Sequence, residues 1–296
     1  MMRYGFAQCH PAVNFIFFTA AVAGMLMFSH PVFTGICFVC AVIYSVSLNN
    51  YKGLLFSLGL LPLVVAFALY YSSYHHFGVT VLQQNMIGNA ITLESLVYGL
   101  VLGLKIAGVG IWFSCIHTIF TTDKVVYLFG AVSPLLSLFL SMTLRMVPRL
   151  KRQIRRIHTA QKGIGKGMGQ GNILRRLHNF IRIFSATITW FIEACVTLSD
   201  SMACRGSRLR GRTAFSIYRF DNRDRSFVVT MFLFLTVTMM GILLQQTRMQ
   251  YDPQLVFPLI TPASWLFWTG FAALCLMPFT LDQVTELQFR KADRLL

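Results

Sequence analysis

The chain has 296 residues, of which 55% are hydrophobic and 12% charged, and its mean hydropathy is +0.61. Soluble proteins contain roughly 25% charged residues, so this composition excludes an ordinary soluble domain and indicates a membrane protein. The formal net charge of +16 must then be interpreted through membrane topology, because cytoplasmic loops collect Lys and Arg. The seven cysteines are an odd number and mostly fall in apolar runs, which argues against a disulfide framework.

A short polar leader is followed by an apolar region at residues 12–48. One helix of that length would measure about 55 Å, nearly twice the roughly 30 Å hydrocarbon core. Pro31 breaks the run, because proline lacks an N–H and disfavours helical backbone at His30. Two spans joined by a tight turn at residues 29–31 are therefore predicted. A signal peptide at residues 12–28 fits less well, because the leader is weakly basic and no small-residue cleavage site follows.

A third span is predicted at residues 53–71, with Pro62 as a kink, and a fourth at residues 96–120. The loop between them, residues 72–95, contains no Lys or Arg and is expected to face outward. The fourth span then returns the chain to the cytoplasmic side.

Lys105 falls inside the predicted fourth span. A charge in the membrane costs about 2.5–3.5 kcal/mol on insertion scales and usually faces a protein interior. Two interpretations are open: the lysine snorkels or pairs with a helix carbonyl, or it lies at an intramembrane partner interface. Glu94, at the outer end of the same span, is a candidate counter-charge.

Residues 121–225 hold 19 of the 26 Lys and Arg residues and only five acids. Within this basic segment, apolar side chains of residues 144–160 recur at steps of three and four (Val147, Leu150, Ile154 and Ile157). This spacing predicts an amphipathic helix that lies on the membrane surface or against other helices. The five glycines that follow, from Gly163 to Gly171, indicate a break. They do not form a phosphate-binding loop, because no strand precedes them and the Gly-Lys-Ser/Thr ending is absent.

Asn172 is the predicted cap of a second long helix, which ends at Arg205 and Gly206 with glycine in the usual stop position. Its apolar residues recur at helical spacing (Leu174, Leu177, Ile181, Phe184 and Ile188). A membrane span is not expected here, because lipid would have to accept three charged side chains (Arg182, Glu193 and Asp200).

The fifth and sixth spans are predicted at residues 227–244 and about 257–279, and a basic tail follows them. The sequence thus predicts an all-α integral membrane protein with six transmembrane helices and both termini in the cytoplasm. Residues 1–120 contain spans one to four, residues 121–226 form a cytoplasmic or membrane-surface module of amphipathic helices, and residues 227–296 contain spans five and six and the tail.

Three stretches resemble, in this order, motifs of one family. SMTLRMVPRL at residues 141–150 is similar to Ser-x-x-Leu-Arg-Phe-x-Pro (Leu144, Arg145 and Pro148). TAQKGIG at 159–165 is similar to Ala-Gln-x-Ala-Arg-Gly, and SMACRGSRLRGRT at 201–213 to Ala-Met-x-Ala-Arg-Gly with a trailing Arg-Thr. HPAVN near the start is similar to an Asp-Pro-x-x-Lys opening. Over almost its whole length, the chain resembles the transmembrane T component of energy-coupling-factor (ECF) transporters, the group that includes the cobalt-transport Q-type permeases.

The resemblance implies a coupling subunit of an ABC-type importer for a vitamin or a transition-metal ion. In that family the Arg-containing motifs end cytoplasmic coupling helices, and each Arg docks on one of two ATP-binding-cassette ATPase subunits. A small membrane protein, the S component, captures the substrate. The second motif is matched here by Cys204, Arg205 and Gly206. Independently of the resemblance, Arg205 lies at a predicted helix C-terminus, where the partial negative charge of the helix favours a cation. The alternative interpretation is that Arg205 contacts anionic lipid at the membrane surface.

The first motif departs from the family pattern. Ile164 stands between Gly163 and Gly165, where the family has Arg. Either Lys162 or Lys166 supplies a charge at this end, or the contact is apolar.

Other functional classes remain open beside this resemblance. No catalytic motif is present, and neither a metal site nor a cofactor is expected: residues 37–40 (CFVC) lie in an apolar span, and loop histidines such as His10 and His75 are usually solvated. A permease that binds its substrate directly would use Lys105 and Glu94. A membrane-anchored nucleic-acid binder is a poorer fit, because no aromatics are interleaved with the arginines of residues 150–158; no nucleic-acid partner is expected.

Overall fold

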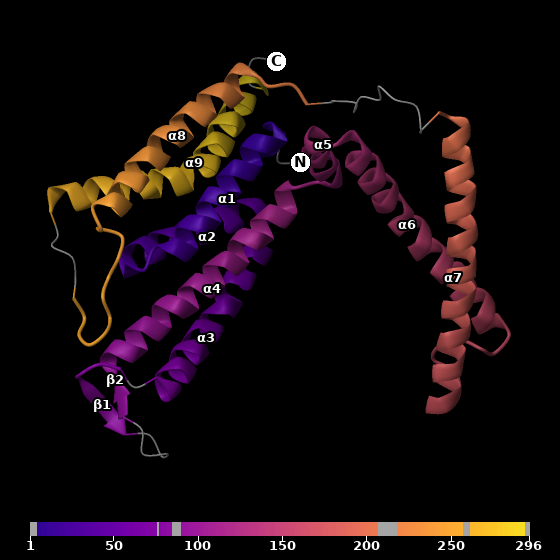
Figure 1. Cartoon of the computed structure of the whole chain (residues 1–296), viewed down its shortest axis with the longest axis horizontal. Coiled ribbons are helices and arrows are strands. Elements are labelled where there is room, and N and C mark those ends of the chain that lie inside the picture. Colours follow the sequence, from indigo (N-terminus) through magenta and orange to yellow (C-terminus); the bar gives the residue numbers. More distant parts are fainter. Residues whose placement is uncertain (1–4, 76, 85–89, 207–217, 257–260, 294–296) are drawn as a thin grey trace. The chain divides into compact units, whose positions relative to one another are not determined.

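The structure is a computed structural model of the whole chain, and it describes residues 5–75, 77–84, 90–206, 218–256 and 261–293. The chain divides into two compact units. Unit 1 combines Met1–Thr121 with Tyr218–Leu296, and unit 2 is Thr122–Ile217. In the described part of the chain, long helices joined by loops make up almost all regular structure, beside one small hairpin and an isolated bridge between Gln250 and Val256 (Figure 1).

The first two long helices of unit 1, α1 (Pro11–Met27) and α2 (Pro31–Asn49), each begin with a His-Pro pair. In each pair the histidine caps the helix, because its Nδ1 accepts a hydrogen bond from the backbone N–H two residues later. The distance is 3.3 Å for His10 and 3.2 Å for His30. His30 has extended backbone (φ −76°, ψ 129°), as expected before a proline. The predicted break at residues 29–31 is confirmed.

The next elements of unit 1 are α3 (Tyr51–Tyr74), β1 (Val81–Gln84), β2 (Ala90–Thr92) and α4 (Leu93–Ile119). The two helices match the predicted third and fourth spans, with Pro62 inside α3. They pack closely, because a Cβ at Gly103 would lie 2.9 Å from the carbonyl oxygen of Val64. The two strands pair antiparallel and were not predicted.

The last two helices of unit 1 are α8 (Asn222–Leu243) and α9 (Pro262–Asp293). Helix α8 begins before the predicted residue 227, because the Asp224 carboxylate accepts a hydrogen bond from the Asp221 N–H (3.3 Å) and stabilises an earlier first turn. Helix α9 continues past the predicted end at residue 279. Its predicted start at residue 257 lies outside the described residues.

Aromatic side chains form the core of unit 1 near the N-terminal segment. Phe6 is fully buried, with its ring centroid 5.4 Å from those of Phe17 and Phe227. Phe17 in turn lies 5.9 Å from Trp112. The backbone N–H of Phe6 donates to Oδ1 of Asp282 at 2.7 Å. The N-terminal segment therefore joins α1, α4, α8 and α9 in one packed cluster.

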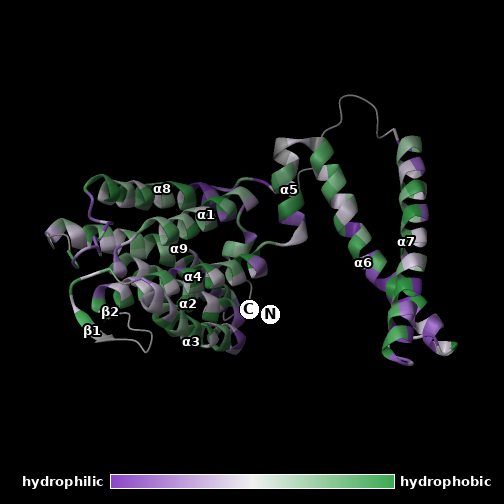
Figure 2. Cartoon of the chain, turned by 60° about the horizontal axis from the view of Figure 1, so that its bottom comes forward, coloured by the Kyte–Doolittle hydropathy of each residue, from purple (hydrophilic) through white to green (hydrophobic). Residues whose placement is uncertain are grey.

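Among the described residues, six helices are long and apolar enough to cross a membrane: α2, α3, α4, α8, α9 and α7 (Ile173–Cys204) of unit 2. The chain is an all-α, multi-pass membrane protein, and the helices of unit 1 are largely hydrophobic in Figure 2. This set differs from the six predicted spans. Helix α1 is apolar but has only 17 residues, whereas α7 meets the same criteria of length and composition. Its charges do not set α7 apart, because Glu193 is the single charged residue between Arg182 and Asp200.

Unit 2 contains α5 (Thr122–Val132), α6 (Pro134–Gly163) and α7. Helix α6 extends beyond the predicted residues 144–160 at both ends, and Pro148 lies inside it. The glycine-rich break follows it as predicted. The predicted cap of α7 is also present, because Oδ1 of Asn172 accepts a hydrogen bond from the Ile173 N–H at 2.9 Å. In Figure 2, α6 and α7 alternate between hydrophobic and hydrophilic residues along their length.

The two long helices of unit 2 pack through one face of each. On α6, Leu150 and Ile154 of the predicted apolar stripe lie opposite Ile183 and Thr187 of α7. The apolar residues of the predicted α7 stripe remain 41% to 77% exposed (Leu174, Leu177, Ile181, Phe184 and Ile188). Helix α7 thus carries apolar surface that unit 2 does not cover.

Candidate functional site

The ends of α6 and α7 have the same local structure. Ile164 caps α6 (φ −96°, ψ 16°), and Arg205 caps α7 (φ −83°, ψ 9°). Each is followed by a glycine in left-handed conformation, Gly165 at φ +77° and Gly206 at φ +72°. This conformation strains residues that have a side chain, so glycine fits both positions. Ile164 therefore occupies, at the end of α6, the position that Arg205 occupies at the end of α7.

Both turns expose their side chains in unit 2. Ile164 is 64% exposed, and its neighbours Lys162 and Gly163 are exposed as well. At the other end, Cys204 and Arg205 are exposed. The two ends thus share a backbone geometry but differ in chemistry, since one presents an aliphatic side chain and the other a guanidinium.

The turn after α6 is held against α7 by hydrogen bonds. Nδ2 of Asn179, which is buried, donates to the carbonyl oxygen of Gly167 at 3.2 Å. The Gly167 N–H donates to Oε1 of Gln170 at 2.9 Å, and the Lys166 N–H donates to the Gln161 carbonyl at 2.8 Å. These bonds fix the end of α6, including Ile164, relative to α7.

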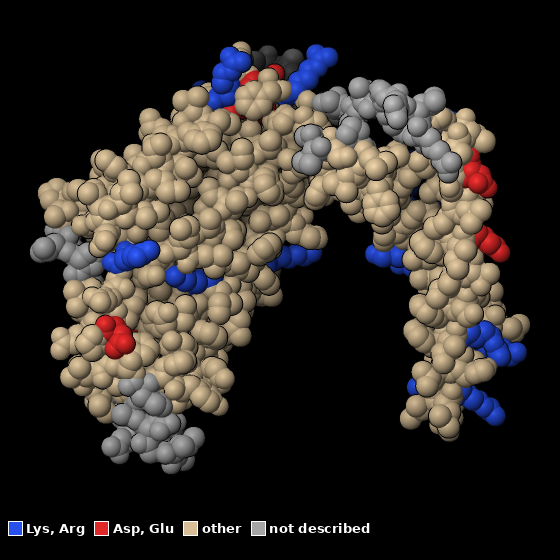
Figure 3. Space-filling view, in the orientation of Figure 1, with Lys and Arg blue, Asp and Glu red and all other residues tan. Residues whose placement is uncertain are grey.

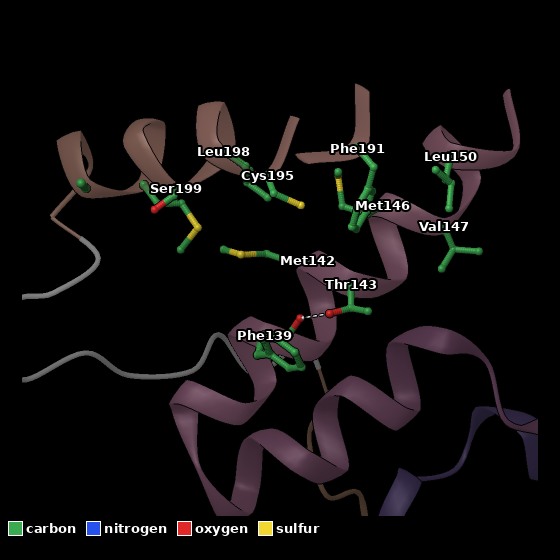
Figure 4. A pocket seen from close by; sticks show the side chains of 12 residues that line it. Phe139, Met142, Thr143, Met146, Val147, Leu150, Phe191, Cys195, Leu198 and Ser199 are labelled. Atoms are coloured by element: carbon green, nitrogen blue, oxygen red, sulfur yellow. Dashed lines mark hydrogen bonds between the residues drawn. The ribbon is translucent and has the colours of Figure 1, made fainter. Parts of the chain in front are cut away.

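An apolar groove of about 680 Å³ runs between α6 and α7 (Figure 4). Met142, Met146 and Phe191 are among the side chains that line it. The Thr143 hydroxyl also lines the groove but donates to the Phe139 carbonyl of its own helix at 2.8 Å, which satisfies its donor internally. A second hollow of about 200 Å³ shares Leu150 and Phe191 with the groove. An apolar partner would fit this surface, because its lining offers little for hydrogen bonding.

A polar pocket of about 290 Å³ adjoins the groove and shares Met142 and Met146 with it. Three arginines line this pocket: Arg145 and Arg149 of α6 and Arg205 of α7. The spacing of Arg145 and Arg149 places them on one face of α6, but no sequence pattern indicated that Arg205 lies on the same pocket.

The three motif residues in the stretch at 141–150 (Leu144, Arg145 and Pro148) lie at different places on α6. Arg145 lines the polar pocket, whereas Leu144 and Pro148 are absent from the linings of the three hollows described above. Leu144 is half-buried, and Pro148 is exposed inside the helix. Arg212 and Thr213, the trailing residues of the last motif, lie outside the described residues.

Lys105 pairs with a helix carbonyl in unit 1. Its Nζ donates to the carbonyl oxygen of Leu26, in the last turn of α1, at 3.2 Å. The N–H that would reach this carbonyl in a continuing helix, that of His30, donates instead to Thr247 at 3.1 Å. Lys105 thus supplies the missing donor. It is only 9% exposed, which leaves little of the side chain for a partner.

Glu94 does not pair with Lys105. Its carboxylate accepts hydrogen bonds from the Thr80 hydroxyl at 2.7 Å and the Thr80 N–H at 3.3 Å. Eleven residues of helix separate Glu94 from Lys105, or about 16 Å. His10 is engaged in capping α1, and no group of three or more His, Cys, Asp or Glu side chains among the described residues could hold a metal ion.

Taken together, the apolar helices and the two exposed helix ends define a multi-pass α-helical membrane protein with a pair of long amphipathic helices. No protein-family model matches the sequence. The chain is similar to the energy-coupling factor transporter transmembrane protein EcfT of Lactococcus lactis subsp. cremoris (strain MG1363), with 30% identity over 99 residues. The matched region covers 33% of this chain and 37% of that protein.

Proposed function

We propose that the chain is the transmembrane coupling subunit, or T component, of an ECF-type ABC importer. The observation that carries the proposal is the pair of like-built, exposed helix ends on α6 and α7, at Ile164 and Arg205. The partial similarity to EcfT supports the same function. In this role residues 121–226 form the coupling module, and residues 1–120 and 227–296 form the membrane part.

Each helix end would contact one ATP-binding-cassette ATPase subunit. Arg205 would bind a carboxylate, because a planar guanidinium makes paired hydrogen bonds to such a group. At the other end, the exposed Ile164 would make an apolar contact, with Lys162 and Lys166 at its edge. ATP hydrolysis would take place in these subunits, and the paired helices would transmit the motion.

The apolar groove and the exposed apolar side chains of α7 would receive a small membrane S component, which would capture a vitamin or a transition-metal ion. We place α7 at the membrane surface, where its exposed charged residues (Arg182, Glu193 and Asp200) would face water and its exposed apolar side chains would contact lipid or the S component. Charged side chains are sparse over the body of unit 1 and gather near the C-terminal end of α9 in Figure 3. If the 17-residue α1 spans the membrane together with α2, α3, α4, α8 and α9, the positive-inside rule would put the basic module and both termini on the cytoplasmic side of the cell membrane.

Direct substrate binding in the membrane has less support. That alternative relied on Lys105 and Glu94, and each is occupied by a hydrogen bond within unit 1.

Charge reversal at Arg205 tests the proposed function. Arg205→Glu should weaken ATPase binding by the 2 kcal/mol or more of an interface hot spot, which is about 30-fold in Kd. Arg156→Glu is the matched control, because Arg156 is exposed on α6 and lines none of the hollows described. Recovery of as much ATPase with Arg205→Glu as with the unchanged chain would contradict the proposed docking.

A further inference from the structure

The polar pocket of unit 2 is lined by three cationic side chains and by no acid. Arg145, Arg149 and Arg205 line it together with the hydroxyl-bearing Ser141 and Ser201. The other lining residues are Leu and Met (Leu138, Met142, Met146, Leu198 and Met202). The pocket therefore gathers positive charge from two helices at one place.

None of the three guanidiniums makes an ion pair with another described residue. The single salt bridge in the described part of the chain joins Arg290 to Glu286 on α9. Three like charges around one hollow repel one another, and the C-terminal carbonyls of α7 offset this only in part. An anionic group in the pocket would relieve the repulsion and could accept hydrogen bonds from the arginines and from Ser141 or Ser201.

We propose that this pocket binds an acidic side chain, Asp or Glu, of the ATPase subunit that contacts the end of α7. Arg145 and Arg149 then belong to the same contact as Arg205, and the docking surface is a three-arginine pocket rather than one arginine. This inference rests on the proposed function. It follows because Arg205 lies both in the exposed turn and on the pocket wall, so that a protein bound to the turn also meets the pocket.

The hollow near the end of α6 differs from this pocket in its chemistry. The hollow near the end of α6 is lined by apolar side chains and one threonine (Leu150, Ile154, Met168, Phe180, Ile183, Phe184, Thr187, Ile188 and Phe191). The two ATPase contacts therefore differ: an acidic surface meets the end of α7, and an apolar surface meets the end of α6.

The test compares two double variants of α6 in the full-length chain. Arg145→Glu with Arg149→Glu reverses two pocket charges. Arg152→Glu with Arg156→Glu reverses two exposed charges at the same spacing that line none of the three hollows. The affinity for the two ATPase subunits that co-purify with the unchanged chain is measured for both, with monodispersity and helix content as folding checks.

We expect the pocket variant to weaken ATPase binding at least 10-fold and the control variant to change it less than 3-fold. Equal losses would show a bulk charge effect and would overturn the proposal. Arg145→Gln with Arg149→Gln removes the charges without reversing them, and it should give an intermediate loss.

Arg205→Glu in the same assay distinguishes failure of the three-arginine pocket from failure of the proposed docking function. If it weakens binding while the pocket variant does not, the three-arginine pocket is wrong and the docking function stands. If neither variant weakens binding, the docking function fails as well. Mass spectrometry of retained phosphatidylglycerol covers a further outcome: loss of this lipid from the pocket variant with unchanged ATPase affinity would make the pocket a lipid site and overturn the proposal.

Discussion

Ile164 offers a quantitative test of the contact at the end of α6. Complete burial of an isoleucine side chain contributes roughly 1.5–3 kcal/mol. Ile164 is still 64% exposed, so about two thirds of this contribution, on the order of 1–2 kcal/mol, remains for a partner to gain. Ile164→Ser should therefore raise the Kd for the ATPase subunits about 5- to 30-fold.

The assay is equilibrium binding of the ATPase subunits to the chain in lipid nanodiscs. The melting temperature should stay unchanged, because Ile164 packs little within unit 2. Lys162→Ser and Lys166→Ser are the comparison variants, since both lysines are exposed and a surface ion pair contributes only about 0–1 kcal/mol. A lysine variant that weakens binding more than Ile164→Ser does would contradict an apolar contact at this helix end.

Three further predictions concern groups whose surroundings the structure defines. Lys105→Gln keeps a hydrogen-bond donor for the Leu26 carbonyl and should retain transport and stability, whereas Lys105→Met removes the donor and should lower the melting temperature. Loss of transport in Lys105→Gln with an unchanged melting temperature would instead favour a substrate contact. Gly206→Ala places a side chain at φ +72° and should cost about 1–2 kcal/mol in the last turn of α7, seen as faster amide exchange there; unchanged exchange would contradict this. Asp282→Ala removes the acceptor that holds the N-terminal segment, so buried Cys9 should react faster with a maleimide. The rate is measured in a variant that lacks the exposed Cys195 and Cys204. An unchanged rate would show that other contacts hold this segment.

Local chemistry explains the parts of the fold that the sequence could predict. Pro31 lacks an N–H, and the glycines from Gly163 to Gly171 tolerate turns, so the breaks at these places follow from the covalent structure of single residues. Asn172 caps α7 through a bond to the next residue, which is equally local. The hairpin of β1 and β2 was missed because strands of four and three residues carry too short a pattern to distinguish them from a loop.

The remaining features depend on contacts between distant parts of the chain. Lys105 was recognised as unusual, but its partner is a backbone carbonyl 79 residues away, and every residue type provides a carbonyl. The sequence also placed Arg145 and Arg205 in separate motifs. Their common pocket depends on how α6 and α7 pack against each other, and the spacing of residues along the sequence does not reveal this packing. The motif comparison aligned Ile164 with the arginine of the family motif. The structure adds that the two helix ends, at Ile164 and Arg205, have matching cap geometry.

The central claim is that this chain couples ATPase subunits to a separate substrate-binding protein. Its most direct test is purification of the tagged chain from native membranes in mild detergent, followed by identification of every protein that accompanies it. We expect two ATP-binding-cassette subunits and one small apolar membrane protein, whose ligand would name the transported substrate. Recovery of the chain alone, binding a solute with an affinity that depends on Lys105, would contradict the account and make the chain a self-contained permease.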